Sequence, residues 1–187
     1  INISISDVNW IQASLPVSDG GLGIRSTALL APSAFLASAA GTRDLQSNIL
    51  LFTTVEEDPW ISHTRQIWTA RYSATEPSAD EAHLQRSWDR ASIEQATAIL
   101  LQHATTDRDR ARLLAVAAPH SGDWLHALSI ASCGLRLDDE SIRIAIGLRL
   151  GTPICATHSC NFGAWVDNMG THGLSCRLGI GRLARHQ

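Results

Sequence analysis

Signals that start and end helices recur along the chain up to position 150 and then cease. Thr106 with Asp109 fits a capping box, and Asp138 precedes an apolar-periodic run that Gly151 closes. Beyond that glycine, helical periodicity is replaced by glycines and cysteines. The pattern predicts a mainly α fold with three parts: an extended and turn segment over 1–25, a helical bundle-like body over 26–151, and an irregular Cys/His-containing basic tail over 152–187.

The first helix of the body is predicted from its small residues. Ser26 is a suitable N-cap and Gly41 a suitable end. Pro32 lies between them and predicts a kink or a break, because proline lacks the N–H that an internal helical position donates. A second short helix is expected over 43–52.

Two further helices are predicted from their N-terminal signals. Asp58-Pro59 places an N-cap before a proline at the first helical position, and the residues that follow put a largely apolar stripe on one face: Trp60, His63, Ile67 and Trp68. Ser78 with Glu81 fits a capping box that would open a helix running to about residue 104.

The N-terminal segment is expected to be extended. Ile1, Ile3 and Ile5 alternate with polar residues, which favours a short strand, and a glycine-rich turn follows at 19–23. The start lacks the basic residues and apolar core of a signal peptide, and no apolar run is long enough to cross a membrane. A nuclear or cytoplasmic location without membrane contact is the expectation.

Three of the four cysteines fall between positions 154 and 176, beside two histidines. Zinc takes four such ligands in tetrahedral geometry, and a segment with so little apolar material would gain order from a metal. The best ligand set is Cys160, His172 and Cys176, with either Cys155 or His158 as the fourth. Two alternatives remain: a glycine-rich loop whose cysteines are buried against the body, and a disulfide.

All fifteen basic residues are arginine, and charge is unevenly distributed. Residues 1–141 hold ten arginines and seventeen acids, a balance of −7, whereas residues 142–187 hold five arginines and one acid, a balance of +4. A basic tail on an acidic body predicts an anionic partner, DNA or RNA. The candidate contacts are Arg177, Arg182, Arg185 and His186 for phosphate and Trp165 for base stacking. A solvated basic end is the alternative.

Several stretches occur together in a familiar order: "WIQASLPVSDGGLGIRSTALLAPSAFLASAA", "AAPHSGDWLHAL", "IAIGLRLGTPIC" and "VDNMGTHGLSCRLGIGRLARH". In these the chain resembles the thumb, linker and Cys/His-knuckle region that follows the polymerase core in reverse-transcriptase-like proteins of animal non-LTR retroelements. The resemblance implies a non-catalytic fragment whose parent copies RNA into DNA. It also implies knuckle residues at Cys160, His172 and Cys176 and a basic end at Arg182, Arg185 and His186.

The chain departs from that family in two respects. The polymerase signature of an aromatic residue, one residue and two aspartates is absent, since Asp138-Asp139 follow Arg136-Leu137. Phe162 stands where relatives often carry a knuckle cysteine.

Three functions follow from the sequence. The first is a nucleic-acid-binding accessory region of a retroelement reverse-transcriptase-like protein, non-catalytic by itself. The second is a helical protein–protein interaction domain, with zinc as a stabilising ion and an acidic body facing a basic partner. The third is a small helical hydrolase using Cys133 or Ser121 with His126, although no nucleophile motif surrounds them.

Overall fold

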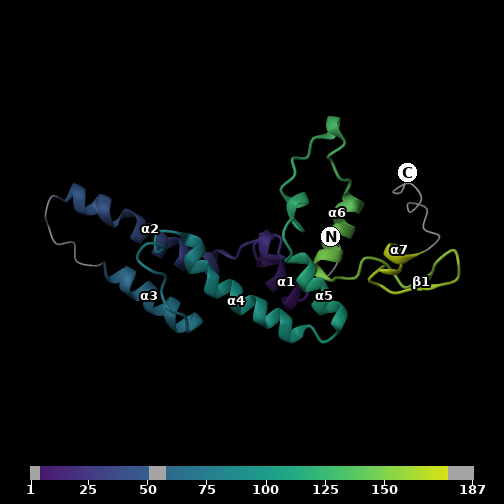
Figure 1. Cartoon of the computed structure of the whole chain (residues 1–187), viewed down its shortest axis with the longest axis horizontal. Coiled ribbons are helices and arrows are strands. Elements are labelled where there is room, and N and C mark those ends of the chain that lie inside the picture. The colour runs from purple at the N-terminus through teal and green to yellow at the C-terminus, as the bar shows by residue number, and fades with distance from the viewer. Residues whose placement is uncertain (1–4, 51–57, 177–187) are drawn as a thin grey trace.

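The computed structural model describes residues 5–50 and 58–176, and the predicted mainly α fold is confirmed (Figure 1). Its helices pack as a bundle beside a two-stranded hairpin. The α-helices are α1 (Asp7–Ser14), α2 (Thr27–Ile49), α3 (Pro59–Tyr72), α4 (Gln85–His103), α5 (Asp107–Val116), α6 (Asp139–Leu150) and the one-turn α7 (His172–Ser175). The strands are β1 (His158–Ser159) and β2 (Trp165–Val166), and short 3-10 helices occupy Val17–Asp19, Asp123–Leu125 and Ala131–Cys133.

The N-terminal segment contains a helix that the extended prediction did not include. Ser6 caps α1 by accepting a hydrogen bond from the Asn9 N–H (3.2 Å), and Asp7 places negative charge in the first turn. Ser6 is a recognisable N-cap residue in the sequence, but the alternating isoleucines before it favoured a strand. Residues 1–4, which hold most of that strand, lie outside the described part of the chain.

The helix after Ser26 is longer than predicted. α2 runs without interruption through Pro32 and Gly41, so the expected short helix at 43–52 is its last part, as far as the structure describes it. Gly41 is exposed, and a Cβ there would lie at ordinary contact distance, 3.5 Å, from the His83 Cβ. α2 packs against α4, with Ser33, Leu36 and Ala37 buried, and this packing offsets the hydrogen bond lost at the proline.

Capping predictions were mostly correct. Asp58, Thr106 and Asp138 each accept the expected hydrogen bond from a first-turn backbone N–H, and Gly151 ends α6 with φ at 69°. The Ser78 box is wrong, since residues 78–82 form a separate turn and α4 begins at Gln85.

The main core lies between α2, α3 and α4. Trp68 is 1% exposed and meets Trp88 edge to face, with ring centroids 5.1 Å apart. Leu36 and Ala37 of α2 complete this buried cluster. Of the predicted apolar stripe on α3, Trp68 is buried, whereas Trp60 is 68% exposed.

A polar network joins the other half of the molecule. Buried Gln12 of α1 donates to the carbonyls of Gly20 and Arg149 and accepts from Arg112 of α5 at 2.9 Å. Arg149 in turn donates to the carbonyls of Val17, Gly21 and Ser121. These bonds hold α1, α5 and α6 together across separations of up to 137 residues.

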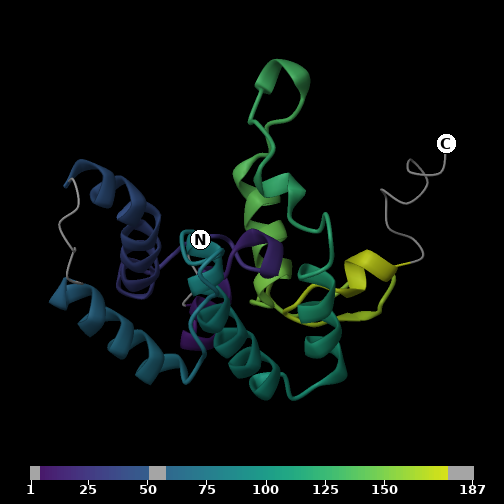
Figure 2. The same cartoon turned by 60° about the vertical axis from the view of Figure 1, so that its left-hand side comes forward.

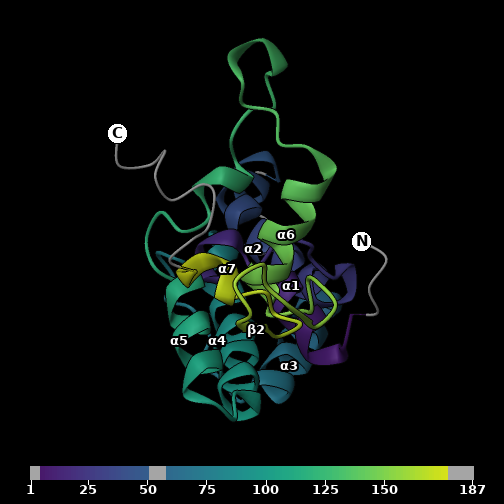
Figure 3. The ribbon, with the colours of Figure 1, turned by 90° about the vertical axis from the view of Figure 1, so that its right-hand side faces the viewer.

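The packed helices leave two features projecting. The segment between residues 126 and 138 forms an arm that stands away from the bundle in two further views (Figures 2 and 3). The Cys/His segment, with β1, β2 and α7, lies at the opposite end of the molecule from the α2–α3 pair (Figure 1). No helix in the described residues has the length and apolar content needed to span a bilayer.

Gly151→Ala is expected to destabilise the fold by about 2–3 kcal/mol. A non-glycine residue at positive φ costs about 1–2 kcal/mol, and the new Cβ would lie 2.5 Å from Nε of Arg112, which the polar network holds in place. Gly134→Ala is the matched control, because Gly134 has the same φ of 69° with no atom near its Cβ position. Equal losses in urea unfolding for both variants would contradict the clash.

Candidate metal centre

The Cys/His segment is built on backbone pairing rather than on a core of its own. The N–H groups of Ile154 and Cys155 both donate to the carbonyl of Asn168, which closes the base of the segment. Above that base, β1 pairs antiparallel with β2, with Ser159 opposite Trp165. The hairpin thus brings residues 158–159 beside residues 165–166, and residues 160–164 form the loop between them.

The loop of the hairpin positions Cys160. Its N–H donates to the Ala164 carbonyl (2.9 Å), and its own carbonyl accepts from the Gly163 N–H (2.9 Å). Gly163 has φ at 78°, a conformation that glycine adopts without the steric cost a side chain would add. This tight turn fixes the cysteine at the inner edge of the loop.

The one-turn helix α7 positions the other two groups. His172 begins it, and the N–H of Cys176 donates to the His172 carbonyl at 2.7 Å. Residues four apart on a helix lie on the same face, one turn above the other. Gly170, at φ 63°, makes the turn that directs α7 back toward the hairpin.

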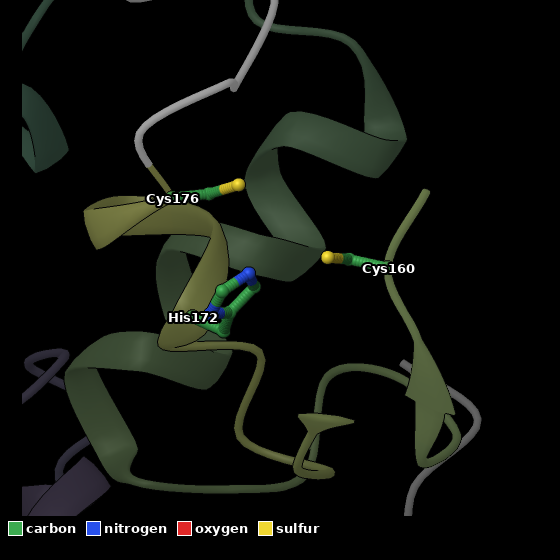
Figure 4. A group of neighbouring side chains, drawn as sticks. All are labelled: Cys160, His172 and Cys176. Carbon is green, nitrogen blue, oxygen red and sulfur yellow. The ribbon is translucent and has the colours of Figure 1, made fainter. Parts of the chain in front are cut away.

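The structure brings Cys160, His172 and Cys176 together, and Figure 4 shows their side chains directed toward a common space. Their candidate ligand atoms all lie within 4.8 Å of one another, and each residue is partly buried. A tetrahedral zinc ion holds its sulfur and nitrogen ligands about 3.5–3.8 Å apart. The ligand atoms would therefore need to approach one another by at most about 1.0–1.3 Å, so the arrangement could hold a metal ion.

The chemistry of the donors fits a transition metal. Among the described residues, Nε2 of His172 is buried and has no hydrogen-bond partner. A buried ring nitrogen without a partner is costly, and a metal ion would remove that cost. Two thiols and one imidazole favour zinc over magnesium or calcium, which prefer oxygen.

The two proposed fourth ligands do not join this group. The Cys155 thiol donates to the Asp167 carbonyl at 3.4 Å, and Nδ1 of His158 lies 2.9 Å from the Ala156 carbonyl. Both residues nevertheless line the same pocket of about 430 Å³ as the three converging groups. The structure therefore brings three of the predicted ligands together, and the choice of Cys155 or His158 as the fourth stays a prediction.

The acid nearest this pocket is already engaged. Glu140 of α6 forms an ion pair with Arg143 at 2.6 Å, which lowers the pKa of Glu140 and raises that of Arg143. Arg143 also donates to the carbonyl of Ile154, so the pair ties α6 to the beginning of the Cys/His segment.

A second arginine ties the far side of the segment to α5. Arg108 forms an ion pair with Asp167 at 2.9 Å and donates to the Thr171 hydroxyl at 2.6 Å. The hydrogen bond from Arg108 holds the pKa of the Asp167 carboxyl below its usual value. Since Thr171 directly precedes His172, this contact fixes the approach of the histidine.

The other predicted sites are only partly placed. Arg177, Arg182, Arg185 and His186 lie outside the described residues. Trp165 is 67% exposed on β2, and Phe162, which drew attention in the sequence only as a missing cysteine, is 57% exposed in the loop that β2 follows. The alternation of the hairpin could have indicated two exposed aromatic side chains, but the strands are too short for periodicity to show it.

The hydrolase residues do not form a site. The Ser121 hydroxyl donates to the Val116 carbonyl instead of to a histidine. Cys133 and His126 are exposed, with Cys133 on the projecting arm. The nearby ring of His120 pairs with Asp123 at 2.9 Å, and both of these side chains face solvent.

No protein-family model, curated protein or solved structure matches this chain. The function is therefore argued from the geometry of the site and from the sequence.

Proposed function

We propose that Cys160, His172 and Cys176 bind a zinc ion that staples the hairpin, and that the stapled hairpin binds single-stranded nucleic acid. In this proposal the chain is a non-catalytic accessory region of a retroelement reverse-transcriptase-like protein. The helical body is the scaffold, and the Cys/His segment with its arginine-containing end is the binding element.

The metal part is supported by three properties of the converging groups. They share one space, they include a buried nitrogen without a partner, and they belong to a segment with little apolar burial of its own. A structural zinc site supplies folding free energy to such a segment directly. One remaining coordination position is left for water or for a side chain of the pocket, His158 or Cys155.

The nucleic-acid part is supported chiefly by the exposed aromatic pair. Phe162 and Trp165 both present most of their surface to solvent on a hairpin that Cys160 anchors. Two exposed aromatic side chains on one short hairpin offer rings on which bases can stack, at about 1–3 kcal/mol each. The arginines that follow Cys176 in the sequence supply the charge that phosphates require.

Trp165→Ala is expected to weaken binding of a fluorescein-labelled, 5′-hydroxyl single-stranded 20-mer about tenfold, which corresponds to the lower part of the stacking range. Fluorescence anisotropy measures it, with RNA and DNA as separate arms. Phe162→Ala should act similarly. Trp60→Ala is the matched control, because Trp60 is as exposed as Trp165 but lies on α3.

The same binding measurement, repeated at several salt concentrations, tests the electrostatic contribution to affinity. Affinity should fall steeply with salt concentration, and an Arg177/Arg182/Arg185→Ala triple variant should flatten that dependence, since each lost phosphate contact reduces the logarithmic slope by about 0.7. The proposal would be refuted if affinity did not depend on salt concentration. It would also be refuted if Trp60→Ala and Trp165→Ala weakened binding equally.

A protein partner is the second candidate, and the projecting arm favours it. Leu128, Leu135 and Leu137 are all exposed there, an unusual concentration of apolar side chains on a short segment. A partner held by this arm would remain bound in the triple arginine variant, which separates the two functions.

A further inference from the structure

A second pocket, of about 400 Å³, lies on the other side of the Cys/His segment from the metal group. Its walls are α5, the loop that follows α5, the C-terminal end of α6 and the turn that precedes α7. Its volume falls in the range of small-molecule sites. Three arginines and one aspartate line it, so its charge is positive.

Arg149 is the most buried of these arginines. It is 4% exposed, and its three donated hydrogen bonds all end on backbone carbonyls. No carboxylate among the described residues forms an ion pair with it. Carbonyl oxygens satisfy the N–H groups but do not neutralise the charge, and burial accordingly lowers the pKa of this guanidinium.

Arg112 adds a second incompletely neutralised guanidinium to the same pocket. Its Nη1 donates to the Gln12 side chain and to the Arg149 carbonyl, whereas its Nε is buried without a partner. Burial lowers the pKa of Arg112 more than the neighbouring Asp109 carboxylate raises it. Asp109 itself accepts a hydrogen bond from the Thr106 hydroxyl at 2.7 Å as part of the α5 cap.

The rest of the lining suits a ligand with a flat apolar part. Trp124, Leu148 and Met169 are among the residues that line the pocket. Arg108 and Thr171 contribute polar groups beside the arginines, while Asp167 pairs with Arg108. With Arg108 paired to Asp167 and Asp109 acting on Arg112, the three arginines keep an excess of one positive charge.

We propose that this pocket binds a nucleoside phosphate, with the phosphate near Arg108, Arg112 and Arg149 and the base against Trp124. An anion would supply the countercharge that the buried guanidinium groups lack, and arginine suits phosphate recognition. The ligand is either a free nucleotide or the terminal nucleotide of a strand. The proposal needs neither the zinc ion nor the exposed aromatic pair of the hairpin.

The test places a negative charge on the wall without disturbing the buried network. Ala115 lines the pocket from the exposed side of α5, so Ala115→Glu adds a carboxylate there in a residue that helices tolerate. Leu114→Glu adds the same charge one position away, where the side chain is 70% exposed and outside the lining. Circular dichroism and thermal unfolding check that both variants fold.

Isothermal titration calorimetry compares AMP with adenosine. Adenosine should bind about tenfold more weakly or worse, because it lacks the charged phosphate. Ala115→Glu should weaken AMP binding about tenfold or more, and Leu114→Glu less than about twofold. A 5′-phosphorylated hexanucleotide that binds more tightly than AMP identifies a strand end, and equal affinities identify a free nucleotide.

Equal affinity for AMP and adenosine, or equal effects of the two glutamate variants, would overturn the proposal. The strands used for the hairpin test carry no 5′-phosphate, and Trp165→Ala leaves this pocket intact. Failure here is therefore distinguishable from failure of the proposed function.

Discussion

Cys176→Ser is expected to reduce bound zinc from about one equivalent per chain to near zero. The described structure offers three candidate ligands, and a chain that keeps only two would hold zinc far more weakly. Inductively coupled plasma mass spectrometry after gel filtration measures the content. If the ion orders the segment as proposed, limited proteolysis should also cut the hairpin faster in the variant.

The matched control is Cys133→Ser, which removes an exposed cysteine on the projecting arm. It should leave both zinc content and proteolysis unchanged. Cys155→Ser and His158→Ala then identify the fourth ligand, since the one that coordinates should lower the zinc affinity without abolishing binding. Retention of a full equivalent of zinc by Cys176→Ser would show that the metal group is not a metal site.

Trp68→Ala is expected to cost about 3–5 kcal/mol of unfolding free energy, a larger loss than Gly151→Ala should cause. Trp68 fills the space between α2, α3 and α4, and its removal leaves a cavity against Trp88, Leu36 and Tyr72. Native stability is typically about 5–15 kcal/mol, so such a loss leaves little reserve. Urea unfolding followed by tryptophan fluorescence and circular dichroism measures it.

Two further variants make this result specific. Trp68→Phe should cost much less than the alanine change, because it keeps most of the volume and removes an indole N–H that is buried without a partner. Trp60→Ala should cost less than about 0.5 kcal/mol, since its side chain faces solvent. Similar losses for Trp60 and Trp68 would place the core elsewhere.

Local signals in the sequence predicted much of the fold. Side-chain caps act within three residues, so Thr106 and Asp138 could be recognised without any tertiary information. The glycine end of α6 is likewise a local property of Gly151. Local reasoning failed at Pro32 and Gly41, which looked like helix breakers, because α2 runs through both and packs against α3 and α4.

The candidate site was predictable in composition but not in geometry. The spacing of Cys160, His172 and Cys176 indicated a metal group, whereas the position of the Cys155 thiol depends on a hydrogen bond to a carbonyl twelve residues away. The arginine pocket gave no sequence signal, because Arg149 contacts carbonyls separated from it by 28 to 132 residues. Such contacts exist only once the helices have packed.

Thr171 and His172 are adjacent in the chain, yet the first belongs to the arginine pocket and the second to the metal group. Arg108 donates a hydrogen bond to the Thr171 hydroxyl, so a shift of the Thr171–His172 peptide would move groups in both the arginine pocket and the metal group. If binding at one site shifts this peptide, the affinity at the other site changes, and thermodynamic reciprocity makes the two effects equal. A single peptide unit would thereby make the chain a two-input sensor, in which the ion sets how strongly the anion is held and the anion sets how strongly the ion is held.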